Sequence, residues 1–203
     1  MLPVITISRQ YGSGGHEVGE KVAQKLNLPF YDKALIAMAA KKSGLCEKIF
    51  ENFDERPKSL LYSIAMDSYM FALPGTGVGD SLEQQVYLAT FNTIRHLAEQ
   101  GPCVIIGRCA DYILREHENC LNVFVHADKA ARIKRIVGLG HCEEKKAPDF
   151  VTKKDKQRAN YYNFYSNNRW DDLLNYDLTI DTSRFSVDMA VDLIIDAAKK
   201  LDV

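Results

Sequence analysis

A run of small residues near the start of the chain has the composition of a phosphate-binding loop. Glycine allows tight turns and close approach of backbone N–H groups to a ligand, and successive N–H groups form a nest for anions. A helix that begins directly after such a loop adds the positive end of its dipole. We therefore expect this run to hold the phosphates of a nucleotide, the alternative being a tight turn that binds nothing. Its residues are Gly12, Ser13, Gly14, Gly15, His16 and Glu17.

The loop departs from the strict P-loop pattern at the positions that carry chemistry. In G-x-x-x-x-G-K-[ST], aligned on Gly15, His16 stands in place of the lysine and Glu17 in place of the hydroxyl residue. A bound polyphosphate would favour protonated His16, and the Glu17 carboxylate is an oxygen ligand of the kind that Mg²⁺ prefers. The alternatives are that His16 only caps the turn, and that Glu17 repels phosphate or only favours the helix N-terminus.

Four cationic residues are placed where an α/β fold would direct them at a bound anion. Arg9 directly follows one apolar run and Arg108 follows another at a glycine, and such strand ends face the ligand crevice of an α/β sheet. Lys154 and Arg158 have i, i+4 spacing, which places them on one face of a helix. We expect Arg9 to bind phosphate and Arg108 to contact a ligand, and Lys154 and Arg158 are further candidates. Structural ion pairs and a solvated charged face are the alternatives.

The chain around these residues alternates strand-like and helix-like segments. The apolar, β-branched runs predict strands at 4–7, 29–31, 103–106, 121–127 and 178–180. Helical spacing predicts helices at 17–26, 33–42, 81–100, 110–116, 128–137 and 153–166, and a last one capped by Ser186. The polar stretch 138–152 is predicted to be a loop or lid. This alternation is typical of a parallel sheet covered by helices on both faces.

Composition narrows the function classes. The chain has 203 residues and a net charge of −1, which suits one domain and indicates no general affinity for nucleic acid or membranes. No signal peptide and no membrane-spanning apolar run is visible. Five cysteines without a C-x-x-C pair are typical of reduced thiols, so we expect a cytoplasmic protein without a metal centre built from cysteine.

Several stretches closely resemble the bacterial cytidylate kinase-like family, whose members look like P-loop nucleoside monophosphate kinases. The resemblance is carried by 7–15 (ISRQYGSGG), 29–33 (PFYDK), 104–114 (VIIGRCADYIL), 122–127 (NVFVHA) and 155–162 (DKQRANYY). It implies an α/β, three-layer P-loop kinase-like fold with strand order 2-3-1-4-5. It also implies a single domain over 1–203, with a helical acceptor-binding insertion at about 32–80 and a lid at about 138–165.

The resemblance also assigns roles. It implies ATP and Mg²⁺ as cofactors, with the loop and Arg9 on the donor and with Lys154 and Arg158 closing over the transferring group. Arg108 matches the family arginine that holds the acceptor, and Asp32 lies where acceptor contacts begin. Asp111 follows Arg108 by one turn and would contact the acceptor too; both aspartates have helix capping as an alternative.

Three functions remain open from the sequence. The first is ATP-dependent phosphoryl transfer to a small acceptor, for which a nucleoside monophosphate such as CMP is one candidate. The second is a nucleotide- or anion-binding module that performs no turnover. The third, a Rossmann-type dehydrogenase, lacks a matching fingerprint. The sequence leaves the oligomeric state open.

Overall fold

A computed structural model describes residues 2–32 and 79–201 of the chain. The predicted helix at 33–42 and most of the predicted insertion at 32–80 lie outside the described residues. No described helix is long and apolar enough to cross a membrane.

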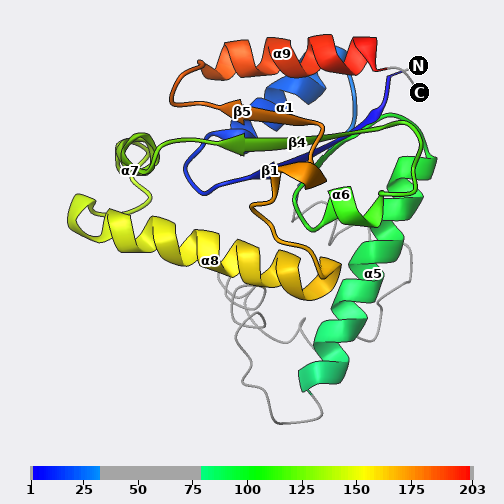
Figure 1. The fold of residues 1–203 in the computed structure, drawn as a ribbon, viewed down its shortest axis with the longest axis horizontal. Coiled ribbons are helices and arrows are strands. Elements are labelled where there is room, and N and C mark those ends of the chain that lie inside the picture. The colour runs from blue at the N-terminus through cyan, green and yellow to red at the C-terminus, as the bar shows by residue number, and fades with distance from the viewer. Residues whose placement is uncertain (1, 33–78, 202–203) are drawn as a thin grey trace.

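A five-stranded parallel sheet forms the centre of the molecule (Figure 1). Its strand order is β2-β3-β1-β4-β5, which confirms the predicted order 2-3-1-4-5. All four neighbouring pairs are parallel, and β1 lies between β3 and β4, with Ile5 opposite Val104 on one side and Leu121 on the other. The strands are β1 (Val4–Arg9), β2 (Phe30–Tyr31), β3 (Val104–Ile106), β4 (Cys120–His126) and β5 (Leu178–Asp181).

Helices cover both faces of this sheet, so the fold has three layers. Figure 1 shows α1 and α9 together on one face, and α5 and α6 on the opposite side. Helix α8 packs against α7. The helices are α1 (Gly15–Leu26), α5 (Gly79–Glu99), α6 (Ala110–Ile113), α7 (Lys129–Gly138), α8 (Ala147–Ser166) and α9 (Val187–Lys200), with short 3₁₀ turns at Glu144–Lys146 and Leu173–Asn175.

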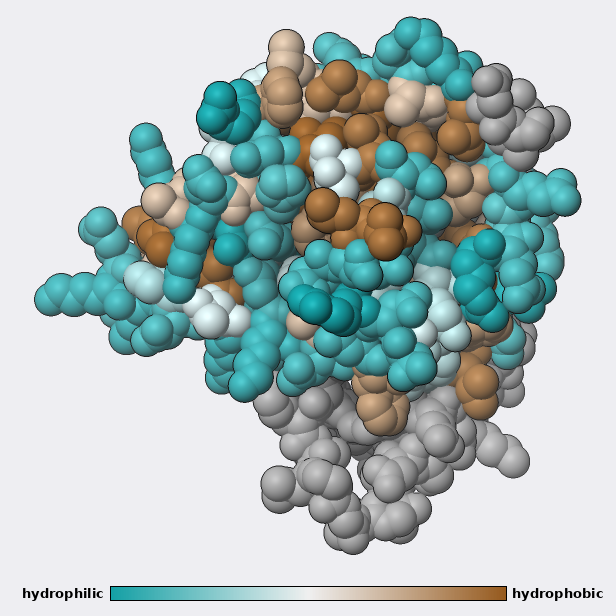
Figure 2. All heavy atoms as spheres, in the orientation of Figure 1, coloured by the Kyte–Doolittle hydropathy of each residue, from teal (hydrophilic) through white to brown (hydrophobic). Residues whose placement is uncertain are grey.

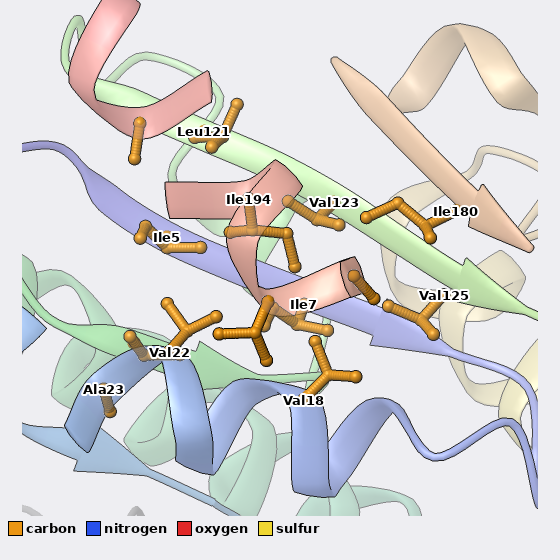
Figure 3. Close-up of a cluster of buried hydrophobic side chains, with 14 of the residues drawn as sticks. Ile5, Ile7, Val18, Val22, Ala23, Leu121, Val123, Val125, Ile180 and Ile194 are labelled. Atoms are coloured by element: carbon orange, nitrogen blue, oxygen red, sulfur yellow. The ribbon is translucent and has the colours of Figure 1, made fainter. Parts of the chain in front are cut away.

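The main core lies between the sheet and the α1–α9 layer (Figure 3). Ile5 and Ile7 of β1 face this layer and are fully buried, as are Val18 and Val22 of α1 and Ile194 of α9. Burying a side chain of this size contributes about 1.5–3 kcal/mol. The alternate residues of β1 face the other layer, where Val4 packs in a second core with α5 and α6. This two-sided burial explains why β1 is a continuous apolar run.

Most predicted element ends agree with the structure to within a few residues, and one does not. Helix α8 begins at Ala147, inside the stretch predicted to be a loop, and Pro148 occupies its first turn. Proline is favoured there because the first turn of a helix leaves its N–H groups unpaired. The charged run 143–146 just before it conceals this start, although Ala147 and Val151 are buried with Ile136.

Figure 2 shows hydrophilic residues over most of the face seen in Figure 1, with hydrophobic atoms gathered over α9. The exposed apolar side chains of that helix include Met189 and Leu193.

Candidate active site

The glycine loop connects the end of β1 to the start of α1 and is too tightly packed for other residues. Gly12 and Gly14 both have φ of 82°, in the left-handed region. A Cβ on Gly12 would lie 2.9 Å from the carbonyl oxygen of Arg132, and a Cβ on Gly15 would lie 2.6 Å from the Cβ of Arg9. The predicted tight turn is therefore present, and it brings the loop against the end of β1.

Ser13 stabilises the conformation of this loop through two hydrogen bonds. Its buried hydroxyl donates a hydrogen bond of 2.9 Å to the carbonyl of Gln10, and its own carbonyl accepts one of 2.6 Å from Thr182 after β5. The N–H groups of the first turn of α1, which begins at Gly15, have no acceptor within the helix. Unpaired N–H groups at a helix start are able to bind an anion.

Glu17 and Arg135 form an ion pair beside the loop. The Arg135 guanidinium also lies over Gly14, where an added Cβ would be 3.1 Å from its Cζ. Glu17 pairs in addition with Lys21, 3.2 Å away and one turn further along α1. A cation from α7 thus stands at the loop, and the Glu17 carboxylate that was a candidate for Mg²⁺ is engaged with two cations.

His16 stands on the opposite side of the loop, close to Asp32. The distance from His16 Nε2 to Asp32 Oδ2 is 3.5 Å, and the imidazole makes an edge contact with Phe30. Val18, the residue after Glu17, has no hydroxyl that could bind a metal. Its side chain is fully buried in the core. Among the described residues no group of three or more His, Cys, Asp or Glu side chains could hold a metal ion.

A cavity of about 200 Å³ opens at the carboxyl ends of β1 and β3. Four cations line it, and none of the described lining residues is Asp or Glu. We call it the cation-lined cavity. It brings together the predicted site residues Arg9, Arg108, Lys154 and Arg158. The other described lining residues are Ser8, Tyr11, Ile106, Gly107, Cys109, Gln157, Tyr161, Tyr162 and Trp170.

Backbone and aromatic contacts fix the guanidinium groups of this cavity. Arg9 lies directly over Gly107, where a Cβ would be only 2.1 Å from its Nη1. Arg158 donates a 2.8 Å hydrogen bond to the carbonyl of Arg9, and its Cζ lies 5.3 Å from the centre of the Tyr11 ring. Arg108 lies over the ring of Tyr161 at the same distance. Cation–π contacts of this kind hold the charges without neutralising them.

Burial and the charges of neighbouring arginines act on Arg9 and Arg158 in the cavity. Burial, followed by the charges of Arg158 and Arg108, lowers the pKa of Arg9 well below its usual value. Burial likewise lowers the pKa of Arg158, although Asp155 opposes this effect. An anion bound between these groups would relieve both the desolvation and the mutual repulsion. The geometry therefore favours a small anionic ligand.

Backbone strain occurs in the same place. Arg108 and Cys109 both have positive φ, 59° and 56°, although neither is glycine. Such a conformation costs about 1–2 kcal/mol per residue and is often found at ligand-binding sites. Here it turns the chain from β3 into α6, so that Arg108 lines the cavity while Cys109 is buried.

Asp111 lies behind the cavity rather than among its described lining residues. Its carboxylate is buried and accepts a 2.6 Å hydrogen bond from the hydroxyl of Tyr162, which does line the cavity. Burial raises the pKa of Asp111 to about 6, against the opposing hydrogen bonds from Tyr162, the backbone and Ser8.

The sequence reasoning missed Tyr11 and Asp155. The Asp155 carboxylate accepts a 2.7 Å hydrogen bond from the Tyr11 N–H and forms a buried ion pair with Arg132. These contacts attach α8, and with it Arg158, to the glycine loop. Because they join residues more than 20 positions apart, no local pattern could have indicated them.

The site can now be compared with known proteins. A model of the cytidylate kinase-like family matches residues 4–184. The chain belongs to this family. The glycine loop and the Gly107–Arg108 turn occur at the same edge of the sheet because β1 and β3 are parallel neighbours. Among curated proteins, none matches the sequence.

Solved structures confirm the P-loop kinase fold. An uncharacterized protein from Eubacterium ventriosum is 30% identical, with a TM-score of 0.74 over 98% of this chain and 99% of the other. A shikimate kinase from Bacteroides thetaiotaomicron is 17% identical, with a TM-score of 0.55 over 98% and 99%. A gluconokinase from Sinorhizobium meliloti is 14% identical, with a TM-score of 0.54 over 97% and 94%. The last two similarities concern the fold.

Proposed function

We propose that this protein transfers a phosphoryl group from ATP to a small anionic acceptor. The observation that carries the proposal is the cation-lined cavity beside a glycine loop at the carboxyl edge of the sheet. Phosphoryl transfer requires mainly that the reacting groups are positioned and that positive charge surrounds the developing negative charge. The cavity and the glycine loop together would supply both. Membership of a kinase-like family supports the same reaction class.

The donor site would be the glycine loop. The N–H groups at the start of α1 would bind the terminal phosphates of ATP, helped by Arg135 over Gly14 and by the His16 imidazole. Arg135 would in this way supply the charge that the usual loop lysine provides. Mg²⁺ usually binds one or two protein carboxylates together with substrate phosphates, and Glu17 is a carboxylate beside the loop. Glu17 would have to exchange its contact with Arg135 to take part.

The acceptor would bind in the cation-lined cavity. Arg108 would hold its anionic group, and so would Arg9, which the resemblance had assigned to the donor. Arg158 and Lys154 on α8 would approach the transferring phosphoryl group. We propose that the segment from 138 into α8 serves as the lid. Nucleoside monophosphates such as CMP and small anionic alcohols are the two acceptor classes that this charge distribution fits.

The site also supports a second function, nucleotide binding without turnover. The Glu17–Arg135 ion pair favours it, because this pair occupies the position from which other P-loop proteins offer a hydroxyl to the metal. The two functions are distinguished by measuring ADP release from ATP and Mg²⁺ with a panel of acceptors, in parallel with thermal unfolding. Acceptor-dependent release is expected for the kinase. ATP-dependent stabilisation without release would identify the binding module.

A further inference from the structure

Asp32 lies between the glycine loop and the cation-lined cavity. It directly follows Tyr31, whose Cα is paired with that of Ile105, so that Asp32 reaches the level of the cavity-lining Ile106. Its Oδ2 atom is 3.5 Å from His16 on the loop. Its charge also acts on Arg9 in the cavity, where it opposes the lowering of the Arg9 pKa. Asp32 is thus close to both proposed substrate sites.

A carboxylate at this position suits one kind of acceptor better than another. A phosphate monoester has a second pKa near 6 and carries almost two negative charges at pH 7. A carboxylate beside its attacking oxygen would add repulsion, and that oxygen has already lost its proton. A hydroxyl group is neutral and can donate a hydrogen bond to the carboxylate. It must also lose its proton as it attacks phosphorus, so it needs a base.

The surroundings of Asp32 fit the role of a base. The adjacent His16 imidazole has a side chain that is 52% exposed, so a proton accepted by the pair can reach solvent. Its edge contact with Phe30, 5.4 Å between ring centroids, helps to hold the imidazole near the carboxylate. The arginines that line the cavity would bind an anionic group elsewhere on the acceptor. The site therefore combines a place for an anion with a place for a neutral hydroxyl.

Building on the phosphoryl transfer proposed above, we propose that the acceptor is a small anionic alcohol and that Asp32 is its general base. The acceptor oxygen forms a bond to the γ-phosphorus of ATP while the bond from this phosphorus to the β,γ-bridging oxygen breaks. ADP leaves with the bonding electron pair. The hydroxyl proton passes to the Asp32 carboxylate and from there through His16 to solvent. The product is a phosphate monoester rather than a diphosphate.

The test uses the full chain with ATP, Mg²⁺ and two sets of acceptors. Glycerate, gluconate and shikimate represent anionic alcohols, and CMP and AMP represent phosphate acceptors. ADP release measures turnover, and ³¹P NMR distinguishes a monoester from a phosphoanhydride. We expect release with at least one alcohol and a monoester signal. Asp32→Asn should lower kcat about 100-fold or more, with a small change in KM and loss of the acidic limb of the pH profile. Glu20→Gln removes an exposed carboxylate of α1 and should change neither.

Each contrary result has a separate meaning. Turnover with CMP or AMP alone, giving a diphosphate, would overturn the acceptor class and leave phosphoryl transfer in place. An alcohol phosphorylated equally fast by Asp32→Asn, with an unchanged pH profile, would remove Asp32 from the reaction. Absence of ADP release with all five acceptors would overturn both this inference and the kinase function. Thermal unfolding of each variant shows whether it is folded when assayed.

Discussion

At the scale of single residues, Arg108 combines a position in the cation-lined cavity with backbone strain. A φ of 59° is unfavourable for a residue with a side chain. At Arg108 this conformation places the guanidinium in one cavity with Arg9 and Arg158. A position of this kind exchanges stability for function. The two properties can be separated by substitution.

We expect Arg108→Gly to change the free energy of unfolding by no more than about 1 kcal/mol. Removal of the left-handed strain, about 1–2 kcal/mol, is offset by the greater entropy of glycine in the unfolded chain and by the lost contact with Tyr161. Denaturant titration of the variant and the wild type measures this difference. A loss of several kcal/mol would show that Arg108 is chiefly a structural residue.

Asp111 makes the stability of the protein depend on pH. Its carboxyl has a pKa of about 6 in the folded state and an ordinary value of 3.8, so the folded state holds the proton more tightly. The proton stabilises the fold fully below the ordinary value, and this stabilisation is lost as the pH rises toward 6. The loss is about 3 kcal/mol, from about two pKa units.

Asp111→Asn should therefore flatten the decline in stability between pH 4 and 6. Asparagine can still accept the hydrogen bond from Tyr162, but it has no proton to release. Unfolding free energies of both proteins, measured in denaturant at several pH values, give the comparison. Parallel curves for the two proteins would contradict the assigned burial of this carboxyl group.

At the scale of elements, the close approach of the glycine loop to β1 sets the relation between the two proposed substrate sites. Gly15→Ala would place a Cβ 2.6 Å from the Cβ of Arg9, an atom fixed to its strand. We expect a loss of about 1–3 kcal/mol in stability and weaker binding of ATP, measured by thermal unfolding with and without nucleotide. Gly138→Ala at the end of α7, where nothing lies within 4 Å, is the matched control and should be neutral or slightly stabilising.

Helix α8 is attached to the loop mainly through Asp155. Asp155→Asn would leave the buried Arg132 guanidinium without its counter-charge, and the expected loss is about 3 kcal/mol or more. Asp149→Asn, at an exposed position of the same helix, should cost less than about 1 kcal/mol. Similar melting temperatures for the two variants would show that the ion pair does not hold α8.

At the scale of the whole molecule, local sequence patterns predicted most strands and helices of the layers but only part of the candidate site. The two-sided apolar runs predicted the parallel strands, and the resemblance supplied their order, which the structure confirms. The start of α8 at Ala147 was missed because Pro148 and the charged run 143–146 just before the helix are typical of a loop. Arg9 lies beside Arg108 because β1 is next to β3. Only the strand order, and no local pattern, places these two strands side by side. The Glu17–Arg135 and Asp155–Arg132 pairs depend on tertiary packing and had no signal in the sequence.

The most direct test of phosphoryl transfer is acceptor-dependent ADP release by the wild type, Arg108→Gly and Arg115→Ala. Arg115 is a half-exposed arginine that contacts Tyr112 and lies outside the described lining of the cavity. We predict that Arg108→Gly remains folded but loses release by a factor of 100 or more, by analogy with the loss of a residue that stabilises transition-state charge (~10²–10³), whereas Arg115→Ala keeps the wild-type rate. Equal rates for all three proteins would contradict the assignment of the cation-lined cavity as the site of the reaction.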